Sequence, residues 1–226
     1  MRLIASMIGC MLLSGLAFAE DIRGQLVLVR PLTKQRVVLP TYELRGVPAH
    51  KGAETGANTI NEWERTVVYL EGNVPEAAPL IRTVNQVGQR FEPEMVVVPV
   101  GSTVSFPNSD PIFHNVFSLS KIRSFDLGFY PAGETRLVKF NKPGVVQVYC
   151  HLHPDMNAAI LVVPNAWYTR PDDHGAFNFS GVPPGNYQVV VWHKSAGFFR
   201  KQVTVSEGGA AKLSMELPVV SSEPRQ

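Results

Sequence analysis

Residues 145–163 read VVQVYCHLHPDMNAAILVV, with two apolar runs on either side of a short polar loop. The runs Val145–Cys150 and Ala158–Val163 have the length and the β-branched content of strands. In and after the first run, a cysteine, a histidine and a methionine follow one another at steps of three residues: Cys150, His153 and Met156. This stretch therefore predicts two strands joined by a loop that carries a thiol, an imidazole and a thioether.

The rest of the chain has the same character. Short runs rich in valine and aromatic residues are separated by glycine, proline and asparagine, and no segment keeps a helical apolar period for three turns. We expect further strands at residues 22–30, 66–70, 94–100, 103–106, 135–140, 177–179, 187–193, 199–205 and 210–217. The spacing predicts an all-β protein, built as an antiparallel sandwich or barrel.

The loop after Cys150 predicts a metal site. A tight loop with three-residue steps can aim a thiolate, an imidazole and a thioether at one point. A second imidazole must come from elsewhere in the fold, and His114 lies about 36 residues earlier, in what we expect to be a loop between strands. One thiolate, two imidazoles and a weak axial thioether form the ligand set of blue-copper electron-transfer sites.

The segment from about residue 90 to residue 163 resembles the cupredoxins, because Cys-x-x-His-x-x-Met follows a distant histidine-asparagine pair. The resemblance implies a Greek-key β-sandwich and one type 1 copper ion. It assigns the equatorial ligands to His114, Cys150 and His153 and the axial ligand to Met156. It also implies that Asn115 ties the two ligand loops together and tunes the thiolate by hydrogen bonding.

A second, smaller β-sandwich unit is expected over residues 165–218, after a cupredoxin-like domain at 20–164 and before a polar tail at 219–226. The motifs Asp172-x-x-Gly175-x-Phe177 and Val182-Pro183-Pro184-Gly185-x-Tyr187 resemble the carboxypeptidase regulatory-like module, which implies packing or partner binding. Roughly fifty residues make a small independent core, so we expect this unit to pack against the first domain.

The first 19 residues have the pattern of a secretory signal peptide. They combine a charged start, a short apolar run and a small-x-small ending, Ala17-Phe18-Ala19. Lipidation at Cys10 is the alternative. Cleavage after Ala19 predicts a periplasmic protein without an integral membrane segment, in which Cys150 is the one remaining cysteine and has no disulfide partner.

Several classes of protein are excluded by counting. A formal net charge of +2 with few, mixed charges gives no nucleic-acid-binding surface. A dinuclear purple copper site needs two cysteines, and a multicopper oxidase needs more than the six histidines of this chain. No nucleophile triad, paired carboxylates or phosphate-binding glycine loop is present, so we do not expect a substrate-converting enzyme.

Two functions remain open. The first is a carrier of single electrons between periplasmic redox partners, which would use the edge of His153 in an apolar patch with these candidate members: Pro111, Phe113, Pro131 and Pro154. The second is a copper-binding accessory protein for storage, delivery or partner assembly. His151 is interpreted as an exposed histidine; a second-sphere residue, a proton site and an alternative ligand are its other interpretations.

Overall fold

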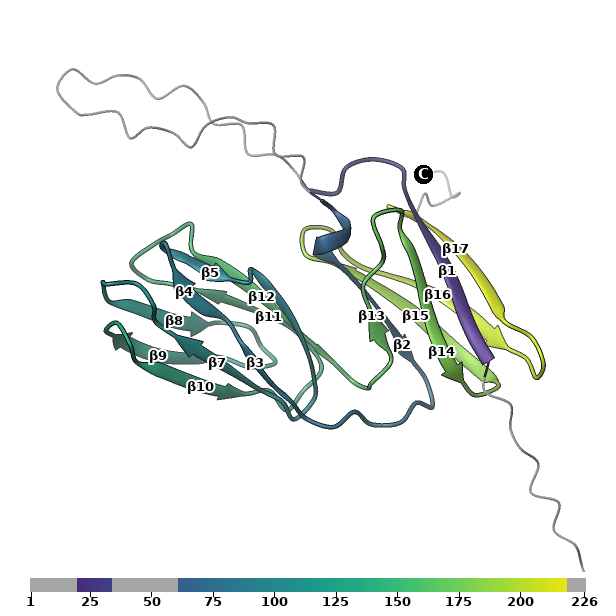
Figure 1. The fold of residues 1–226 in the computed structure, drawn as a ribbon, viewed down its shortest axis with the longest axis horizontal. Coiled ribbons are helices and arrows are strands. Elements are labelled where there is room, and N and C mark those ends of the chain that lie inside the picture. The colour runs from purple at the N-terminus through teal and green to yellow at the C-terminus, as the bar shows by residue number, and fades with distance from the viewer. Residues whose placement is uncertain (1–19, 34–60, 219–226) are drawn as a thin grey trace, which may run out of the picture.

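The structure is a computed structural model that describes residues 20–33 and 61–218 (Figure 1). The signal peptide expected at 1–19 and the tail expected at 219–226 lie outside the described residues. Within them the fold is all-β, as predicted, with a single 3-10 turn, η1, at Trp63–Arg65. No helix in the part of the chain that the structure describes is long and apolar enough to cross a membrane.

The first sandwich holds the predicted metal-binding segments. One of its sheets has five strands in the order β6 (Met95–Pro99), β12 (Asn157–Val163), β11 (Gly144–Tyr149), β8 (His114–Ser118), β9 (Phe125–Tyr130). The facing sheet has three strands in the order β10 (Thr135–Lys139), β7 (Thr103–Pro107), β3 (Ile81–Thr83). A short hairpin, β4 (Asn85–Val87) and β5 (Arg90–Glu92), completes this half.

The second sandwich is built from both ends of the described chain. Its four-stranded sheet runs β13 (Tyr168–Thr169), β2 (Thr66–Glu71), β15 (Gly185–His193), β16 (Gly197–Val205). Its three-stranded sheet runs β14 (Ala176–Val182), β1 (Glu20–Leu28), β17 (Ala211–Leu217). The strands β1 and β2 therefore belong to the second sandwich, which differs from the expected boundaries of 20–164 and 165–218. The strands after residue 165 alone would enclose too small a core. The two earlier strands, β1 and β2, complete that core.

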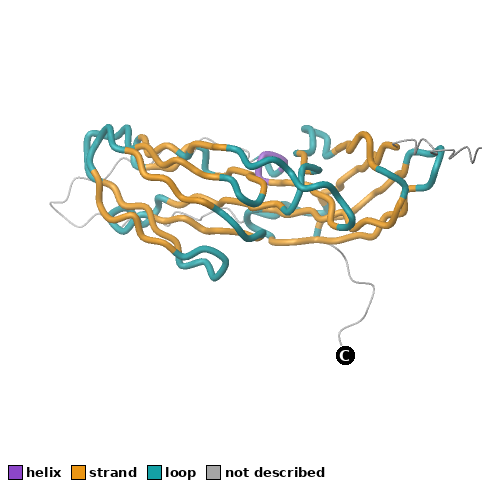
Figure 2. Tube along the Cα trace, turned by 90° about the horizontal axis from the view of Figure 1, so that it is seen from below, coloured by secondary structure: helices purple, strands orange, loops and turns teal. Residues whose placement is uncertain are grey.

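The four larger sheets are stacked as layers, with a buried apolar cluster between each sheet and the next. One cluster fills the first sandwich and includes Phe106, Tyr130 and Phe140, and a second fills the other sandwich. A third lies between the sandwiches, where the five-stranded sheet faces the four-stranded one. Its buried members are Val67, Tyr69, Met95, Ala159, Leu161, Val163, Val190 and Trp192. The expected packing of the second unit against the first is thus a continuous apolar contact, and the molecule is elongated (Figures 1 and 2).

The strand that leaves the metal-binding loop is buried on both faces. Along β12, Ala158, Ile160 and Val162 enter the core of the first sandwich. The alternate residues Ala159, Leu161 and Val163 enter the cluster between the sandwiches. A strand covered on both sides has a continuous apolar sequence rather than an alternating one, which accounts for the run AAILVV.

The sheets are mixed rather than purely antiparallel as predicted. Three pairs of strands run parallel: β6 with β12, β3 with β7, and β1 with β17. Each pair joins strands that are distant in sequence, because parallel neighbours require a long connection between them. No short-range sequence pattern predicts such a parallel pair.

Candidate metal centre

The loop after β11 brings its side chains to one end of the first sandwich. It is closed by two backbone hydrogen bonds, from Met156 N to His153 O at 2.9 Å and from Cys150 N to Met156 O at 3.3 Å. Cys150 directly follows β11, and β11 pairs with β8 in the sheet. His114 is the first residue of β8 rather than a loop residue as expected. Its position in a strand fixes it more firmly than a loop would.

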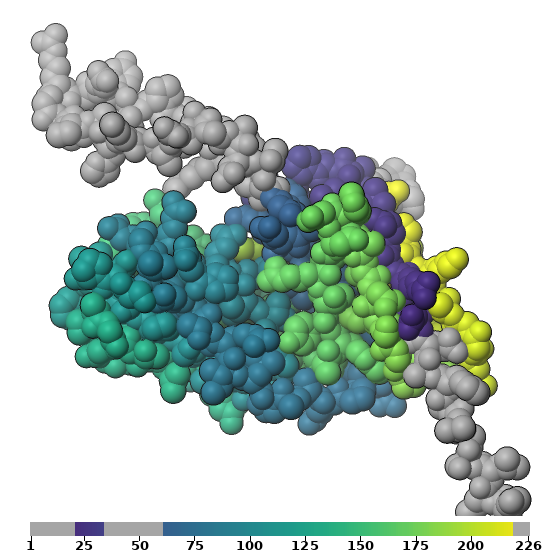
Figure 3. Space-filling model, in the orientation of Figure 1, coloured from purple at the N-terminus to yellow at the C-terminus, as the bar shows by residue number. Residues whose placement is uncertain are grey.

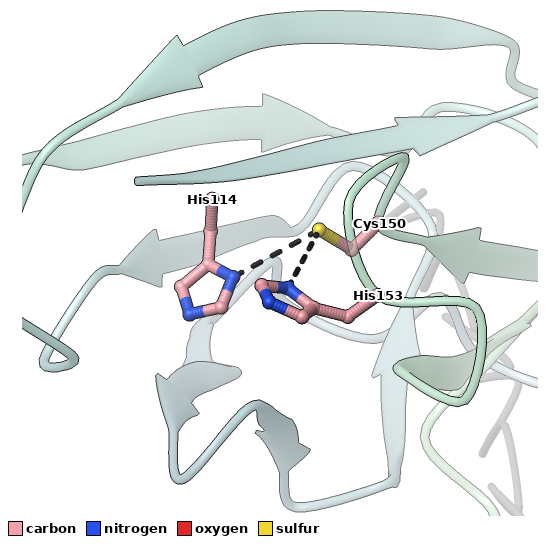
Figure 4. Close-up of side chains that lie close together, drawn as sticks. All are labelled: His114, Cys150 and His153. Atoms are coloured by element: carbon pink, nitrogen blue, oxygen red, sulfur yellow. Dashed lines mark hydrogen bonds between the residues drawn. The ribbon is translucent and has the colours of Figure 1, made fainter. Parts of the chain in front are cut away.

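Three side chains converge there, as Figure 4 shows. The Sγ atom of Cys150 lies 3.8 Å from Nδ1 of His114 and 3.7 Å from Nδ1 of His153. One ligand atom from each of the three residues lies within 4.8 Å of the other two. His114 is fully buried, Cys150 is buried and His153 is partly exposed. One strand, β8, and the loop after β11 therefore present one sulfur and two nitrogens to a common point.

These separations match those of ligands that share a metal ion. First-row metals bind thiolate sulfur at about 2.3 Å and imidazole nitrogen at about 2.0 Å, so a trigonal arrangement puts the two donors about 3.7 Å apart. Both sulfur–nitrogen distances agree with this value. The donor types and their spacing fit the predicted copper ion.

Asp110 fixes the orientation of His114. Its Oδ2 atom lies 2.7 Å from Nε2 of His114, and both residues are buried. An ionised carboxylate only accepts hydrogen bonds, so the proton of the imidazole is on Nε2 and the lone pair on Nδ1 points toward Cys150. A metal-binding histidine commonly has such a carboxylate on its other nitrogen.

The hairpin β4–β5 holds Asp110 in its ionised form. The backbone N–H of Gly88 donates to Oδ1 at 2.6 Å, and that of Gln89 donates to Oδ2 at 2.8 Å. Both residues have positive φ, 60° at Gly88 and 57° at Gln89, which aims consecutive amides in one direction. Burial acts to raise the pKa of Asp110, but the hydrogen bonds from Gln89, His114 and Gly88 outweigh it and lower the pKa.

Asn108 shapes the loop between Asp110 and His114. Its side-chain amide donates to the carbonyls of Ile112 at 2.9 Å and Tyr130 at 3.1 Å, and its Oδ1 accepts from Asp110 N at 3.1 Å. Sequence reasoning missed both Asn108 and Asp110. The available signal was weak: two short polar residues precede His114, and no sequence pattern connects Asp110 to its amide partners Gly88 and Gln89.

Met156, the predicted axial ligand, is buried at 1% exposure in the same apolar cluster as Cys150. The two backbone hydrogen bonds that close the loop set its position. Its burial agrees with the environment that a weak thioether ligand needs, and its role as a ligand stays a prediction.

Asn115 has different partners from those expected. Its Nδ2 donates to Asp126 Oδ1 at 2.7 Å, and its buried Oδ1 has no hydrogen-bond partner among the described residues. It therefore joins β8 to β9 and not the two ligand loops to each other. Alternation along β8 explains the difference, since His114 and Val116 face the core while Asn115 is directed toward the neighbouring strand.

His151 lies outside the converging group. Its ring stacks on Phe117 with the centroids 3.8 Å apart and the planes at 4°, and its Nε2 lies 3.6 Å from Asp126 Oδ2. The side chain is 47% exposed. The interpretation as an exposed histidine is confirmed.

Exposed apolar side chains flank His114 and His153 in the sequence. Phe113 is 56% exposed, Leu152 is 50% exposed and Ile112 is 39% exposed. Pro111 and Pro154 are also exposed, and Pro131 is partly exposed. The loops that carry the two histidines thus expose apolar residues 111–113, 152 and 154, which are called the apolar rim here.

No protein-family model matches this chain, and no curated protein does. Solved structures match part of it. A copper-containing nitrite reductase from Thermus scotoductus SA-01 is 28% identical with a TM-score of 0.37, over 43% of this chain. The match spans about a quarter of that reductase, 26% of its length.

Two small copper proteins match over nearly their whole length. The Cu(I) form of an amicyanin variant is 19% identical with a TM-score of 0.34, over 42% of this chain and 98% of its own. A purple cupredoxin from Nitrosopumilus maritimus is 25% identical with a TM-score of 0.33, over 38% of this chain and 100% of its own. The structural similarity to cupredoxins is therefore partial and covers about two fifths of the chain.

Proposed function

We propose that this protein binds one type 1 copper ion through His114, Cys150, His153 and Met156 and carries single electrons. The observation that supports this most directly is the convergence of one sulfur and two imidazole nitrogens at separations of 3.7 and 3.8 Å. A soft thiolate together with two imidazoles is the donor set that copper prefers. Bound copper would supply the one-electron couple between Cu(II) and Cu(I).

The residues of the chain keep the site rigid. His114 is held by β8 and by the hydrogen bond to Asp110, and the loop from Cys150 to Met156 is closed by its own backbone. Donors that stay in place when the charge of the metal changes keep the rearrangement small, and a small rearrangement makes electron transfer fast.

Electrons would enter and leave through the edge of His153. His114 is fully buried, whereas His153 is partly exposed between Leu152 and Pro154 of the apolar rim. An apolar rim can dock briefly on a redox partner with little desolvation of charge, which suits a transient encounter. The partner would be an exported redox protein.

We further propose that the chain is exported to the periplasm and begins at Glu20 after cleavage. Mass analysis of the N-terminus of exported protein tests this, and a lipid-modified chain starting at Cys10 would contradict it. The second sandwich, which resembles the carboxypeptidase regulatory-like module in sequence, would support the copper-binding half through the apolar contact between them.

The central experiment is the visible spectrum of the protein loaded with Cu(II). We expect one copper per chain and an intense band from thiolate-to-copper charge transfer, which Cys150→Ser abolishes. Loading with Zn²⁺ gives a colourless control that separates metal binding from colour. A colourless protein with one bound Cu(II) would contradict the type 1 site.

Rates distinguish an electron carrier from a protein for copper storage or delivery. A carrier exchanges electrons rapidly with a small redox dye and releases copper slowly to a chelator, because its ligands are held in place. Rapid release of Cu(I) to an apo acceptor, with slow electron exchange, would favour delivery.

A further inference from the structure

A pocket lies at the junction of the two sandwiches, beside the edge strand β6. Its volume is about 560 Å³, within the range of about 300 to 1,000 Å³ that is usual for small-molecule sites. It lies where β13 of the second sandwich approaches β3 and β6 of the first, along the boundary between the two lobes in Figure 3. Junctions between folded units are a frequent location of ligand sites.

The floor of the pocket is apolar. Val67 is completely buried, and Met95 and Val96 are 5% and 6% exposed. Val67 and Met95 also belong to the cluster that joins the sandwiches, so this floor is fixed by the packing of two sheets. A floor of this kind accepts the hydrocarbon part of a ligand.

Two arginines, Arg82 and Arg170, line the same pocket. Among residues 20–33 and 61–218, no carboxylate lies within ion-pair distance of either guanidinium. Other arginines do form ion pairs: Arg65 binds Glu94 at 2.7 Å, and Arg136 binds Glu134 at 2.7 Å. Two positive charges thus line the pocket with no carboxylate of the described chain in ion-pair contact, and Glu64 acts on Arg170 only from a longer distance.

The guanidinium of Arg170 is held in place. It donates from one nitrogen to the backbone carbonyl of Glu64 and keeps its other N–H groups for further partners. Burial lowers the pKa of Arg170, and the charge of Glu64 offsets this only in part. The hydroxyl-bearing residues Thr83, Tyr168 and Thr169 line the pocket as well.

We infer that this pocket binds a small organic anion, with its hydrocarbon body on the Val67–Met95 floor and its carboxylate on Arg82 and Arg170. An arginine binds a carboxylate through paired hydrogen bonds, which are stronger than those between neutral groups. The pocket is lined by residues of β2, β3, β6 and β13 and by none of the converging side chains, so we expect it to bind whether or not copper is present.

Octanoate is a suitable probe, because it combines an eight-carbon body with one carboxylate. Calorimetric titration of the full chain, with and without copper, is expected to show saturable binding with one octanoate per chain. The neutral analogue 1-octanol is expected to bind about tenfold more weakly or worse, since it lacks the charge-assisted bonds. Inorganic phosphate, which lacks the apolar body, is expected to show no saturable binding.

Three variants locate the site. Arg82→Gln and Arg170→Gln are each expected to weaken octanoate binding about tenfold, and Thr83→Trp is expected to abolish it by filling the pocket. Arg90→Gln, an exposed arginine on β5 outside the pocket, is the matched control and is expected to leave affinity unchanged. Urea midpoints equal to wild type show that each variant is folded; where Arg170→Gln is not, the other two variants decide.

Three results would overturn the inference. They are the absence of saturable octanoate binding, equal affinity for octanoate and 1-octanol, and a loss of affinity in Arg90→Gln as large as that in Arg82→Gln. The first would show that the pocket is a passive junction, the second that it is only an apolar surface, and the third that octanoate binds by general charge attraction.

Discussion

The carboxylate of Asp110 sets the charge that surrounds His114. Together with the thiolate of Cys150, it would balance the double charge of Cu(II), whereas Cu(I) would leave a net negative charge in a buried place. A site of this composition stabilises the oxidised metal. The residue that tunes the proposed centre is thus one that does not touch the metal.

Replacing Asp110 with Asn is therefore expected to raise the reduction potential. The amide can still accept the hydrogen bond from His114 but carries no charge, so the affinity for Cu(II) should fall by about 10- to 100-fold relative to Cu(I). For a one-electron couple this is about 60 mV for each tenfold change. Redox titration measures it, with Glu134→Gln as the control because Glu134 is exposed and bound to Arg136. An unchanged potential in Asp110→Asn would assign Asp110 a purely structural role.

Met156 and His114 are expected to respond differently to substitution. Met156→Leu should keep both copper and colour and raise the potential, because Cu(II) loses a donor that Cu(I) needs less. His114→Ala should open an equatorial position and weaken copper binding by about 100-fold or more. Copper titration with spectra and potentials compares them. If Met156→Leu lost copper as readily as His114→Ala, the axial assignment would be wrong.

At the scale of the secondary-structure elements, the strands predicted from valine-rich runs are present, and two strands of the site-bearing sheet were not predicted. The runs before and after the metal-binding loop appear as β11 and β12. The strands β8 and β9 were missed, because HNVFS and FDLGFY mix polar and apolar residues and contain no valine-rich run. The three converging side chains were identified from residue type and spacing alone, whereas Asp110 depends on a hairpin that no local pattern connects to it.

A buried pair, Glu62 and His193, joins residues 32–33, which follow β1, to the end of β15. Glu62 accepts hydrogen bonds from the backbone of Leu32 and Thr33 at 2.8 Å and lies 2.9 Å from His193 Nε2. The other ring nitrogen accepts from the amides of Ser195 and Ala196. A neutral imidazole thus ties the end of β15 to the segment that follows β1.

This pair predicts a loss of stability in mild acid. Burial lowers the pKa of His193, and the charge of Glu62 offsets this only in part, so below about pH 6.5 the unfolded chain takes up a proton that the folded chain does not. The free energy of unfolding then falls as the pH falls. The pKa of Glu62 is also lowered, because its hydrogen bonds outweigh its burial, and this adds a further loss below its usual value of 4.5.

Urea unfolding of the metal-free protein at about pH 7.5 and about pH 5.5 measures the effect. His193→Gln should reduce the difference between the two pH values, since the amide does not titrate. His174→Gln is the matched control, because His174 is exposed in the same sandwich. If the free energy of unfolding depended equally on pH in His193→Gln and in wild type, groups other than His193 would cause the dependence.

At the scale of the whole molecule, we expect the cluster between the sandwiches to make them unfold as one cooperative unit. Trp192 is 2% exposed and lies in this cluster. Trp192→Ala should cost about 3 to 5 kcal/mol, as for other large core residues, and should separate unfolding into two transitions. Phe198→Ala, on the neighbouring strand and 39% exposed, is the control. During one denaturation, circular dichroism follows the strands of both sandwiches, and the colour of bound copper follows the first sandwich. Coincident curves in Trp192→Ala would contradict the proposal that this cluster couples the two sandwiches.

The parallel pairing of β1 with β17 has a consequence for how the chain reaches this fold. Residues 22–28 of the first strand pair with residues 211–217 of the last, so the contact spans almost the whole described chain. During synthesis the first strand emerges early and has no partner in its sheet on that side until the last strand is available. Closing so long a loop is slow, because the entropy is lost before the contacts form. We therefore expect the second sandwich to form last. An intermediate in which only the first sandwich is formed should precede the native state.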